Sequence, residues 1–277
     1  MENNELKRLA LEVRKNIVRA VYFARSGHPG GSLGAADILT YLYFEEMKNL
    51  DPKNPRKNDR DRFVLSKGHC SPALYSVLAL KGFFSIEDLV TFRHTGSYLQ
   101  GHPNMNETPG IDMSTGSLGQ GISAAVGMAL AGKLTHKGYH VYTLLGDGEC
   151  EEGEVWEAAM LAGNRHLDNL TVIIDWNGLQ IDGKIEEVNS PLPFDKKFEA
   201  YHFKVFQVED GNDFIQLRNV FTEARKVKNM PVAIICRTIK GKGVSFMENS
   251  VEWHGKAPNE EQYRIAMEEL RKAGENL

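Results

Sequence analysis

Five short runs rich in β-branched and apolar residues alternate with longer segments of helical periodicity, and this alternation constrains the fold most. The runs predict strands at 62–66, 140–145, 170–175, 204–208 and 232–237. Helices are expected over about 5–25, 35–47, 71–81, 119–135, 153–164, 213–227 and 259–273. Short strands separated by helices are typical of a parallel sheet. We therefore expect residues 1–277 to form one α/β domain, with a parallel sheet of about five or more strands and helices on both faces.

The composition excludes several classes of protein. Of the 277 residues, 42% are hydrophobic and 25% are charged, which is typical of a globular protein. The net charge of −4 gives no global positive field, so no nucleic-acid partner is expected. No apolar run approaches the roughly 20 residues that span a bilayer, and the amino-terminal segment lacks a signal peptide's apolar core. Because Cys70, Cys150 and Cys236 are far apart and odd in number, they predict no metal finger, and we expect a cytoplasmic protein without a membrane partner.

Polar residues follow two of the predicted strands directly. Gly146-Asp147-Gly148 ends one strand, and Asn177 follows the next. A right-handed crossover would place these strands side by side, with both ends at the edge where parallel sheets bind ligands. A carboxylate, an amide oxygen and a main-chain carbonyl form a hard oxygen set that suits Mg²⁺ or Ca²⁺. The glycines and the following helix start also suit an anion, although the same residues occur in ordinary strand-to-helix turns.

Four of the nine histidines stand next to glycine in loops of small residues. They are His28, His69, His102 and His254. Histidine is the side chain best suited to proton transfer near neutral pH, so the set indicates catalysis. A solvent-exposed or structural role stays the alternative for each one taken singly. The remaining histidines, which lack this setting and are expected to be ordinary, are His94, His136, His140, His166 and His202.

These loops resemble a known family. The Gly-Asp-Gly and Asn unit is similar to the thiamine diphosphate motif shared by transketolases, 2-oxoacid dehydrogenases and decarboxylases. Seven segments then occur in the order found in the amino-terminal half of transketolase: SGHPGGSLG, SKGH, GHPN, TGSLGQG, GDGECEEG, DWNGLQIDG and TIKGKGV…WHG. They cover positions 26–255, which is nearly the whole chain. The resemblance implies the thiamine diphosphate-binding fold of the diphosphate-binding (PP) domain.

The resemblance also implies roles for individual residues. Asp147, Asn177 and the main-chain oxygen of Leu179 are expected to bind Mg²⁺, with Ca²⁺ or Mn²⁺ as alternatives. The residues expected to contact thiamine diphosphate are His69, Gly116, Ser117, Leu118, Gly148, Glu149, Asn177 and His254. The expected catalytic residues are His28, His102, His254 and Glu152, and the three histidines are also expected to bind the donor sugar.

Four details accompany this assignment. Ser117 stands where the family usually has proline, so the main-chain contact there is expected to differ slightly. Glu152 matches a family glutamate near the subunit interface, although acidic residues also favour the first turn of a helix. Lys240 and Lys242 either meet the anionic cofactor or form a solvated basic turn. The charged stretch at 51–62 is expected to be a surface loop.

The resemblance implies that half of the enzyme lies elsewhere. In transketolases, the glutamate that activates the aminopyrimidine belongs to a second, pyrimidine-binding domain, which is absent here together with the carboxyl-terminal domain. We therefore expect the amino-terminal subunit of a split transketolase, which forms an α₂β₂ assembly with a carboxyl-terminal subunit. The reaction would transfer a two-carbon ketol unit from a ketose phosphate to an aldose acceptor. The alternatives are the α subunit of a 2-oxoacid dehydrogenase, a split transketolase specialised for an unusual sugar, and a non-catalytic interaction protein.

Overall fold

The centre of the molecule is a five-stranded, fully parallel sheet. The structure is a computed structural model, and it describes residues 1–275 and 277. The strand order is β1-β2-β3-β5-β4, and each strand pairs in parallel with its neighbours. The strands are β1 (Arg62–Leu65), β2 (Val141–Gly146), β3 (Leu170–Trp176), β4 (Lys204–Val208) and β5 (Val232–Arg237). Every predicted strand is confirmed to within one residue at each end.

Alternate residues of the strands enter two separate cores, one on each face of the sheet. In β2, Tyr142 and Leu144 belong to the larger core, whereas Val141 and Leu145 belong to the smaller one. This alternation follows from the two-residue period of a strand. Because both faces are covered, the strands consist largely of apolar residues, as is typical of parallel sheets.

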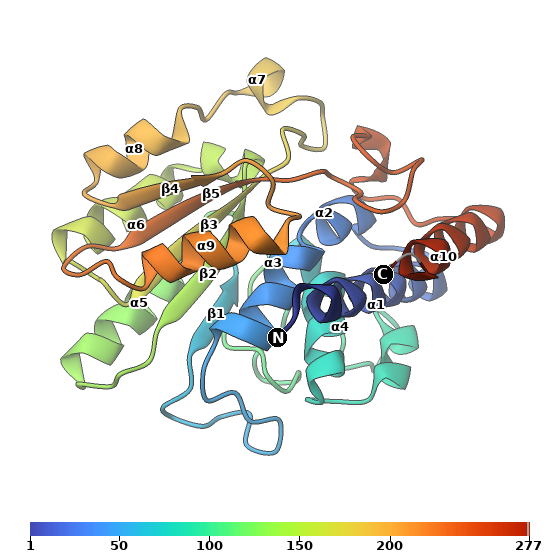
Figure 1. Ribbon diagram of the computed structural model, residues 1–277, viewed down its shortest axis with the longest axis horizontal. Coiled ribbons are helices and arrows are strands. Elements are labelled where there is room, and N and C mark those ends of the chain that lie inside the picture. Colours follow the sequence, from blue (N-terminus) through green and yellow to red (C-terminus); the bar gives the residue numbers. More distant parts are fainter. Residues whose placement is uncertain (276) are drawn as a thin grey trace.

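Helices cover both faces, so the molecule has three layers (Figure 1). The larger core packs the sheet against helices that include α1 (Asn3–Ala24), α3 (Ala36–Tyr41), α4 (Ser71–Lys81) and α9 (Phe214–Ala224). The smaller core packs it against α5 (Gln120–Leu134), α6 (Gly153–Asn164) and α8 (Phe194–Ala200). The predicted three-layer α/β fold is confirmed.

The helix expected over 35–47 is not a single α-helix. After α3, the chain forms a π-helical turn, η1 (Leu42–Glu46). Glu46 at its end is 2% exposed, accepts a hydrogen bond from Tyr142, and pairs with Arg225. The wider turn thus carries a buried carboxylate toward the sheet. Short helices without a clear amphipathic period were not predicted, namely α2 (Pro29–Gly34), α7 (Ile185–Val188) and α8.

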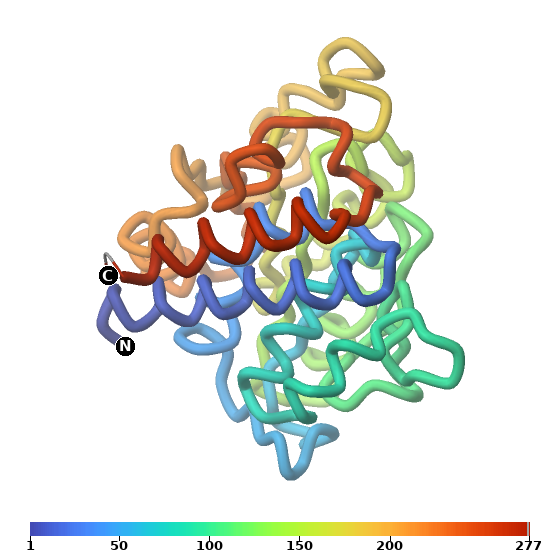
Figure 2. The backbone as a smooth tube through the Cα atoms, turned by 90° about the vertical axis from the view of Figure 1, so that its right-hand side faces the viewer, coloured from blue at the N-terminus to red at the C-terminus, as the bar shows by residue number. Residues whose placement is uncertain are grey.

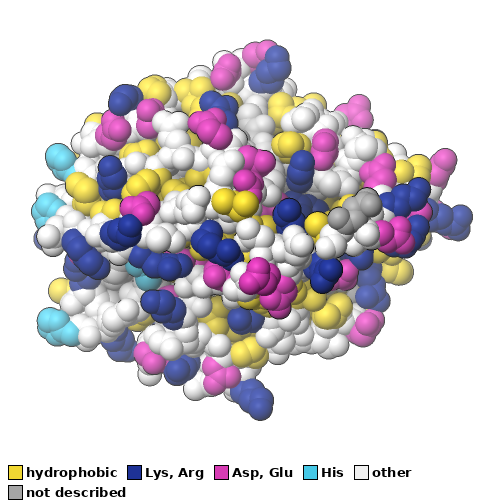
Figure 3. All heavy atoms as spheres, in the orientation of Figure 1, with side chains coloured by type: hydrophobic (Ala, Val, Ile, Leu, Met, Phe, Trp, Pro, Cys, Tyr) yellow, Lys and Arg dark blue, Asp and Glu magenta, His cyan; other side chains and the backbone are white. Residues whose placement is uncertain are grey.

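The two ends of the chain lie together. Helix α10 (Glu260–Glu275) runs antiparallel beside α1, with both termini at the same end of the pair (Figure 2). Tyr22 stacks on Tyr263 with 4.1 Å between ring centroids. On the face drawn in Figure 3, cationic and anionic side chains both occur over most of the surface. None of the helices described in the structure is long and apolar enough to cross a membrane.

Candidate cofactor and active site

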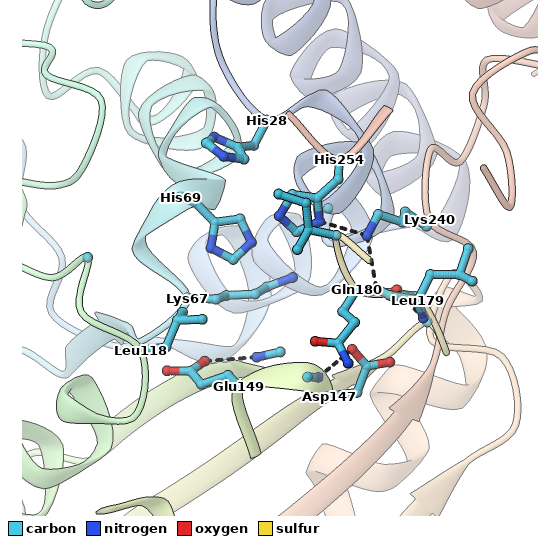
Figure 4. Close-up of a pocket in the computed structure, with 16 residues that line it drawn as sticks. His28, Lys67, His69, Leu118, Asp147, Glu149, Leu179, Gln180, Lys240 and His254 are labelled. Carbon is cyan, nitrogen blue, oxygen red and sulfur yellow. Dashed lines mark hydrogen bonds between the residues drawn. The ribbon is translucent and has the colours of Figure 1, made fainter. Parts of the chain in front are cut away.

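A pocket of about 220 Å³ lies at the carboxyl ends of the strands, where a parallel sheet binds its ligands. The ends of β1, β2, β3 and β5 each contribute to it, together with the loops at His28, Gly116 and His254 (Figure 4). Ten of the predicted site residues line this pocket: His28, His69, Gly116, Leu118, Asp147, Gly148, Glu149, Asn177, Leu179 and His254. Sequence segments more than 200 residues apart therefore meet in one cavity.

Strands β2 and β3 bring Asp147 and Asn177 together, as their predicted adjacency required. Gly146 pairs with Asp175 in the ladder, so the two chains leave the sheet side by side. The Asp147 carboxylate accepts a hydrogen bond from the Gly148 amide at 2.9 Å and from the Gly178 amide at 2.5 Å. Asp147 is 2% exposed, and burial, followed by the nearby Asp175 charge, raises its pKa to about 7. A bound cation would therefore stabilise the ionised form of this buried carboxylate.

Lys240 follows β5 and reaches the same loop. Its ammonium group donates to the main-chain oxygen of Leu179 at 2.9 Å and lies 3.0 Å from Nδ1 of His254. Lys240 is 2% exposed, and burial lowers its pKa to about 8. Of the two alternatives for this lysine, a solvated basic turn is therefore wrong for Lys240, because its charge points into the pocket.

The residues present fit a divalent metal and an organic diphosphate. Asp147, the Asn177 side-chain oxygen and the Leu179 carbonyl are hard oxygen donors, and each has lone pairs beyond its present hydrogen bonds. Within the described chain, no group of three or more His, Cys, Asp or Glu side chains could hold a metal by itself. The three protein oxygens leave coordination positions of such a cation open, and oxygens of a diphosphate can fill them. Because Gly148 has no side chain, such a ligand can approach the main chain there closely. A Cβ atom at this position would come within 3.1 Å of Gln180.

Three imidazoles form a cluster on the opposite side of the pocket. The ring centroids of His28, His69 and His254 are 5.2 to 5.5 Å apart in all three pairs. Burial lowers the pKa of His28 to about 4 and that of His254 to about 3, and Lys240 adds to the effect on His254. Burial also places the pKa of His69 well below its ordinary value. All three rings are neutral at physiological pH, so each has one donor and one acceptor nitrogen. The acceptor of His254 is taken by Lys240, which leaves its N–H for a polyhydroxylated substrate.

His28 has an unused hydrogen-bonding atom. Its Nδ1 is buried and has no partner among the described residues. An unpaired buried polar atom in a cavity requires an explanation, and a bound ligand is one. This atom and the neutral imidazole cluster together make the pocket suited to a ligand rich in hydroxyl groups.

The floor of the pocket is a buried ion pair. Lys67 at the end of β1 pairs with Asp175 on β3, and both side chains are at most 2% exposed. Thr238 donates to the other oxygen of Asp175, and the Asn177 amide lies 3.5 Å away. Burial alone would lower the pKa of Lys67, but the Asp175 charge outweighs this and raises it. The pair therefore fixes the strand ends under the metal-binding loop.

Three of the predicted residues lie beside the pocket without lining it. His102 is exposed and packs against Gly116, where a Cβ atom would come within 3.0 Å of its ring. Ser117 is exposed between two lining residues. Glu152 is also exposed, and its side chain contacts Gly119 at the start of α5. The structure therefore places all three at the rim, where a ligand or another chain could reach them.

Several lining residues were missed from sequence. They are Gly31, Lys67, Gln180 and Ile181. Lys67 follows β1 and leads directly into the predicted site residue His69, so its position along the chain was a usable signal. Gln180 and Ile181 immediately follow the predicted metal-binding loop, but nothing in their residue type indicated a role.

Comparisons with known proteins agree with this geometry. Residues 6–273 match the family described as transketolase, thiamine diphosphate binding domain. The chain is 45% identical to the 6-deoxy-6-sulfo-D-fructose transketolase subunit SqwG of Clostridium sp., covering 98% of each protein. It is 44% identical to an apulose-4-phosphate transketolase subunit of Phocaeicola vulgatus, covering 95% of this chain and 93% of that protein.

A solved structure shows the same fold in a longer protein. Transketolase from Campylobacter jejuni superposes with a TM-score of 0.92 at 37% identity, over 98% of this chain and 43% of that one. The chain therefore spans less than half the length of this solved enzyme. The family match, the relatives and the shared fold together show that this chain belongs to the transketolase family and is a thiamine diphosphate-binding domain of that family.

Proposed function

We propose that this chain is the cofactor-binding subunit of a two-subunit transketolase and transfers a two-carbon ketol unit from a ketose to an aldose acceptor. One observation carries the proposal: an oxygen donor set for a metal and a cluster of neutral imidazoles face each other across a single pocket. The first side suits a metal diphosphate, and the second suits a sugar. A cytoplasmic location is part of the proposal.

The residues on the metal side hold the cofactor. Asp147, Asn177 and the Leu179 carbonyl would bind Mg²⁺, and Gly148 and Lys240 would meet the diphosphate. The Lys240 ammonium, which now donates to the Leu179 carbonyl, is within reach of an anion at the same point. When bound, thiamine diphosphate supplies the nucleophilic carbon and the electron sink for carbon–carbon bond cleavage.

The residues on the imidazole side hold the sugar and move protons. His254 donates a hydrogen bond to a hydroxyl group of the donor sugar, and the buried, unpaired Nδ1 of His28 provides a second contact. His102 at the rim binds a further hydroxyl beside Gly116. Because the pKa values of His28 and His254 lie at about 4 and 3, both rings are neutral when the substrate binds. Nδ1 of His254 accepts from Lys240, so its Nε2–H is left to donate to the sugar.

A partner chain completes the enzyme. Two relatives that match this chain over almost their full length are named as transketolase subunits, and longer transketolases contain more than twice its length. A second chain carrying a pyrimidine-binding domain therefore supplies the rest of the site, in an α₂β₂ assembly. The alternative, a 2-oxoacid dehydrogenase subunit, is not favoured, because the family and the relatives are transketolases.

The relatives favour an unusual sugar as substrate. One is named for 6-deoxy-6-sulfo-D-fructose and another for apulose 4-phosphate. Both names describe a sugar that carries an anionic group, a sulfo group in one and a phosphate in the other. We therefore propose a ketose donor that carries a terminal phosphate or sulfonate, and a role in the pentose phosphate pathway is one case of this.

Calorimetry with thiamine diphosphate and Mg²⁺ tests the proposal on the purified chain and on its complex with the partner. Asp147→Ala should abolish Mg²⁺-dependent binding, whereas the exposed Glu186→Ala on α7 should bind as the wild type does. Unchanged affinity in Asp147→Ala would exclude this metal site. In the complex, ketol transfer from a sulfonated or phosphorylated ketose should require both chains, and transfer by this chain alone would exclude the split arrangement.

A further inference from the structure

Glu149 lines the cofactor pocket, but its carboxylate is already fully engaged by the protein. It lies in the 3₁₀ turn η4 (Gly148–Glu151) and is 3% exposed. One oxygen accepts from the Ser66 hydroxyl at 2.5 Å and from the Gly119 amide at 3.0 Å. The other accepts from the Gly146 amide at 2.9 Å. In Figure 4 the side chain lies toward Leu118 and away from the Asp147 carboxylate.

These three donors come from separate segments around the pocket. Ser66 follows β1, Gly146 ends β2 in the diphosphate turn, and Gly119 ends the segment 116–119, of which Gly116 and Leu118 line the pocket. Gly119 has a φ of +84° and precedes the first residue of α5, so it has no side chain of its own to cap that helix. The first turn of α5 also packs on β1, since a Cβ atom at Gly121 would approach Ser66 within 2.6 Å.

We propose that Glu149 is a positioning residue that joins the 116–119 wall to the diphosphate turn at 146–148 and so sets the width of the cofactor pocket. The inference rests on the proposed function, in that thiamine diphosphate is taken as the ligand that spans the two walls. Glu149 acts through Gly119 and Gly146 and does not itself touch the cofactor.

The chemistry of the side chain explains why a carboxylate serves here. All three donors are uncharged N–H or O–H groups, and an ionised carboxylate is an acceptor at both oxygens. Its charge also lies at the amino-terminal end of α5, where the helix dipole favours an anion. Glutamine has the same size, but its NH₂ group would face one of the two main-chain amides. Only one of those two hydrogen bonds could then survive.

Amide hydrogen exchange of the chain without cofactor tests the connection directly. In Glu149→Ala, exchange at both Gly119 and Gly146 should be about tenfold faster than in the wild type, because both hydrogen bonds are lost. In Glu149→Gln, only one of the two amides should become faster. Glu157→Gln, an exposed glutamate on α6, is the matched control and should change neither. If Glu149→Ala does not fold, Glu149→Gln decides, and wild-type exchange at both amides overturns the proposal.

A second experiment asks whether one wall responds to a ligand on the other. Inorganic diphosphate with Mg²⁺ occupies only the diphosphate half, so in the wild type it should slow exchange at 146–148 and also at 116–119. In Glu149→Gln, the protection at 116–119 should fall by about tenfold relative to that at 146–148. Equal protection of both segments in wild type and variant would overturn the proposal. No protection of 146–148 in the wild type would instead count against the proposed function, and the exchange rates without ligand would still test the role of Glu149.

Discussion

Replacement of Lys67 by methionine should destabilise the chain by about 3 kcal/mol, because it leaves a carboxylate buried without its cation. Lys67 and Asp175 are 2% and 0% exposed, so solvent screens their interaction little. Removal of one partner of a buried ion pair costs about 3–5 kcal/mol. The lower end applies here, because Thr238 still donates to Asp175 in the variant. Methionine keeps the length of the lysine side chain, so little cavity is added to the electrostatic cost.

The double variant separates the charge effect from packing. Asp175→Asn alone should also be destabilising, since it leaves the Lys67 ammonium buried without a counter-ion. The combination Lys67→Met with Asp175→Asn removes both charges, so its loss should be smaller than the sum of the single losses by about 2–3 kcal/mol. Lys133→Met is the matched control, because the Lys133–Asp168 pair is 38% and 23% exposed and should contribute less than about 1 kcal/mol.

Urea unfolding of the cofactor-free chain, followed by circular dichroism, measures these free energies. A loss below about 1 kcal/mol in Lys67→Met, or additive losses in the double variant, would refute the argument that this pair fixes the pocket floor.

Two further predictions follow from burial and from close packing. The pKa of His28 lies at about 4 in the folded chain and 6.5 when unfolded, so the unfolded state binds the extra proton and stability should fall as pH drops from 6.5 toward 4. Between these two pH values, the free energy of unfolding should fall less in His28→Gln than in the wild type. An equal fall in both proteins would contradict a buried, neutral His28 ring. Gly163→Ala should cost about 2–3 kcal/mol or more, since its Cβ would lie 1.7 Å from the Tyr201 carbonyl, whereas Gly127→Ala meets no atom within 4 Å and should gain about 0.5–1 kcal/mol. Melting temperatures that move in the same direction for both glycine variants would exclude this packing.

The sequence was sufficient for the sheet and for one side of the pocket because the signals there are local. Strands β4 and β5 have the predicted bounds, since a run of β-branched residues between helices is recognisable within a few residues. The adjacency of β2 and β3 followed from the handedness of the crossover, and it brought Asp147 and Asn177 together as expected. The histidine loops were also identified locally, by the glycines and prolines beside them.

The tertiary structure alone decided how distant groups share space and charge. The sequence predicted the histidines of the cluster as a set, but their mutual spacing, and the burial that keeps them neutral, depend on loops from opposite ends of the chain. The orientation of Lys240 into the pocket likewise depends on where the loop after β5 folds back. Glu149 was expected to contact the cofactor, yet its oxygens face Ser66, Gly119 and Gly146. Strand and helix periods are set by neighbouring residues, whereas a hydrogen bond such as the one between Glu149 and Ser66 joins residues 83 positions apart, which no local pattern encodes.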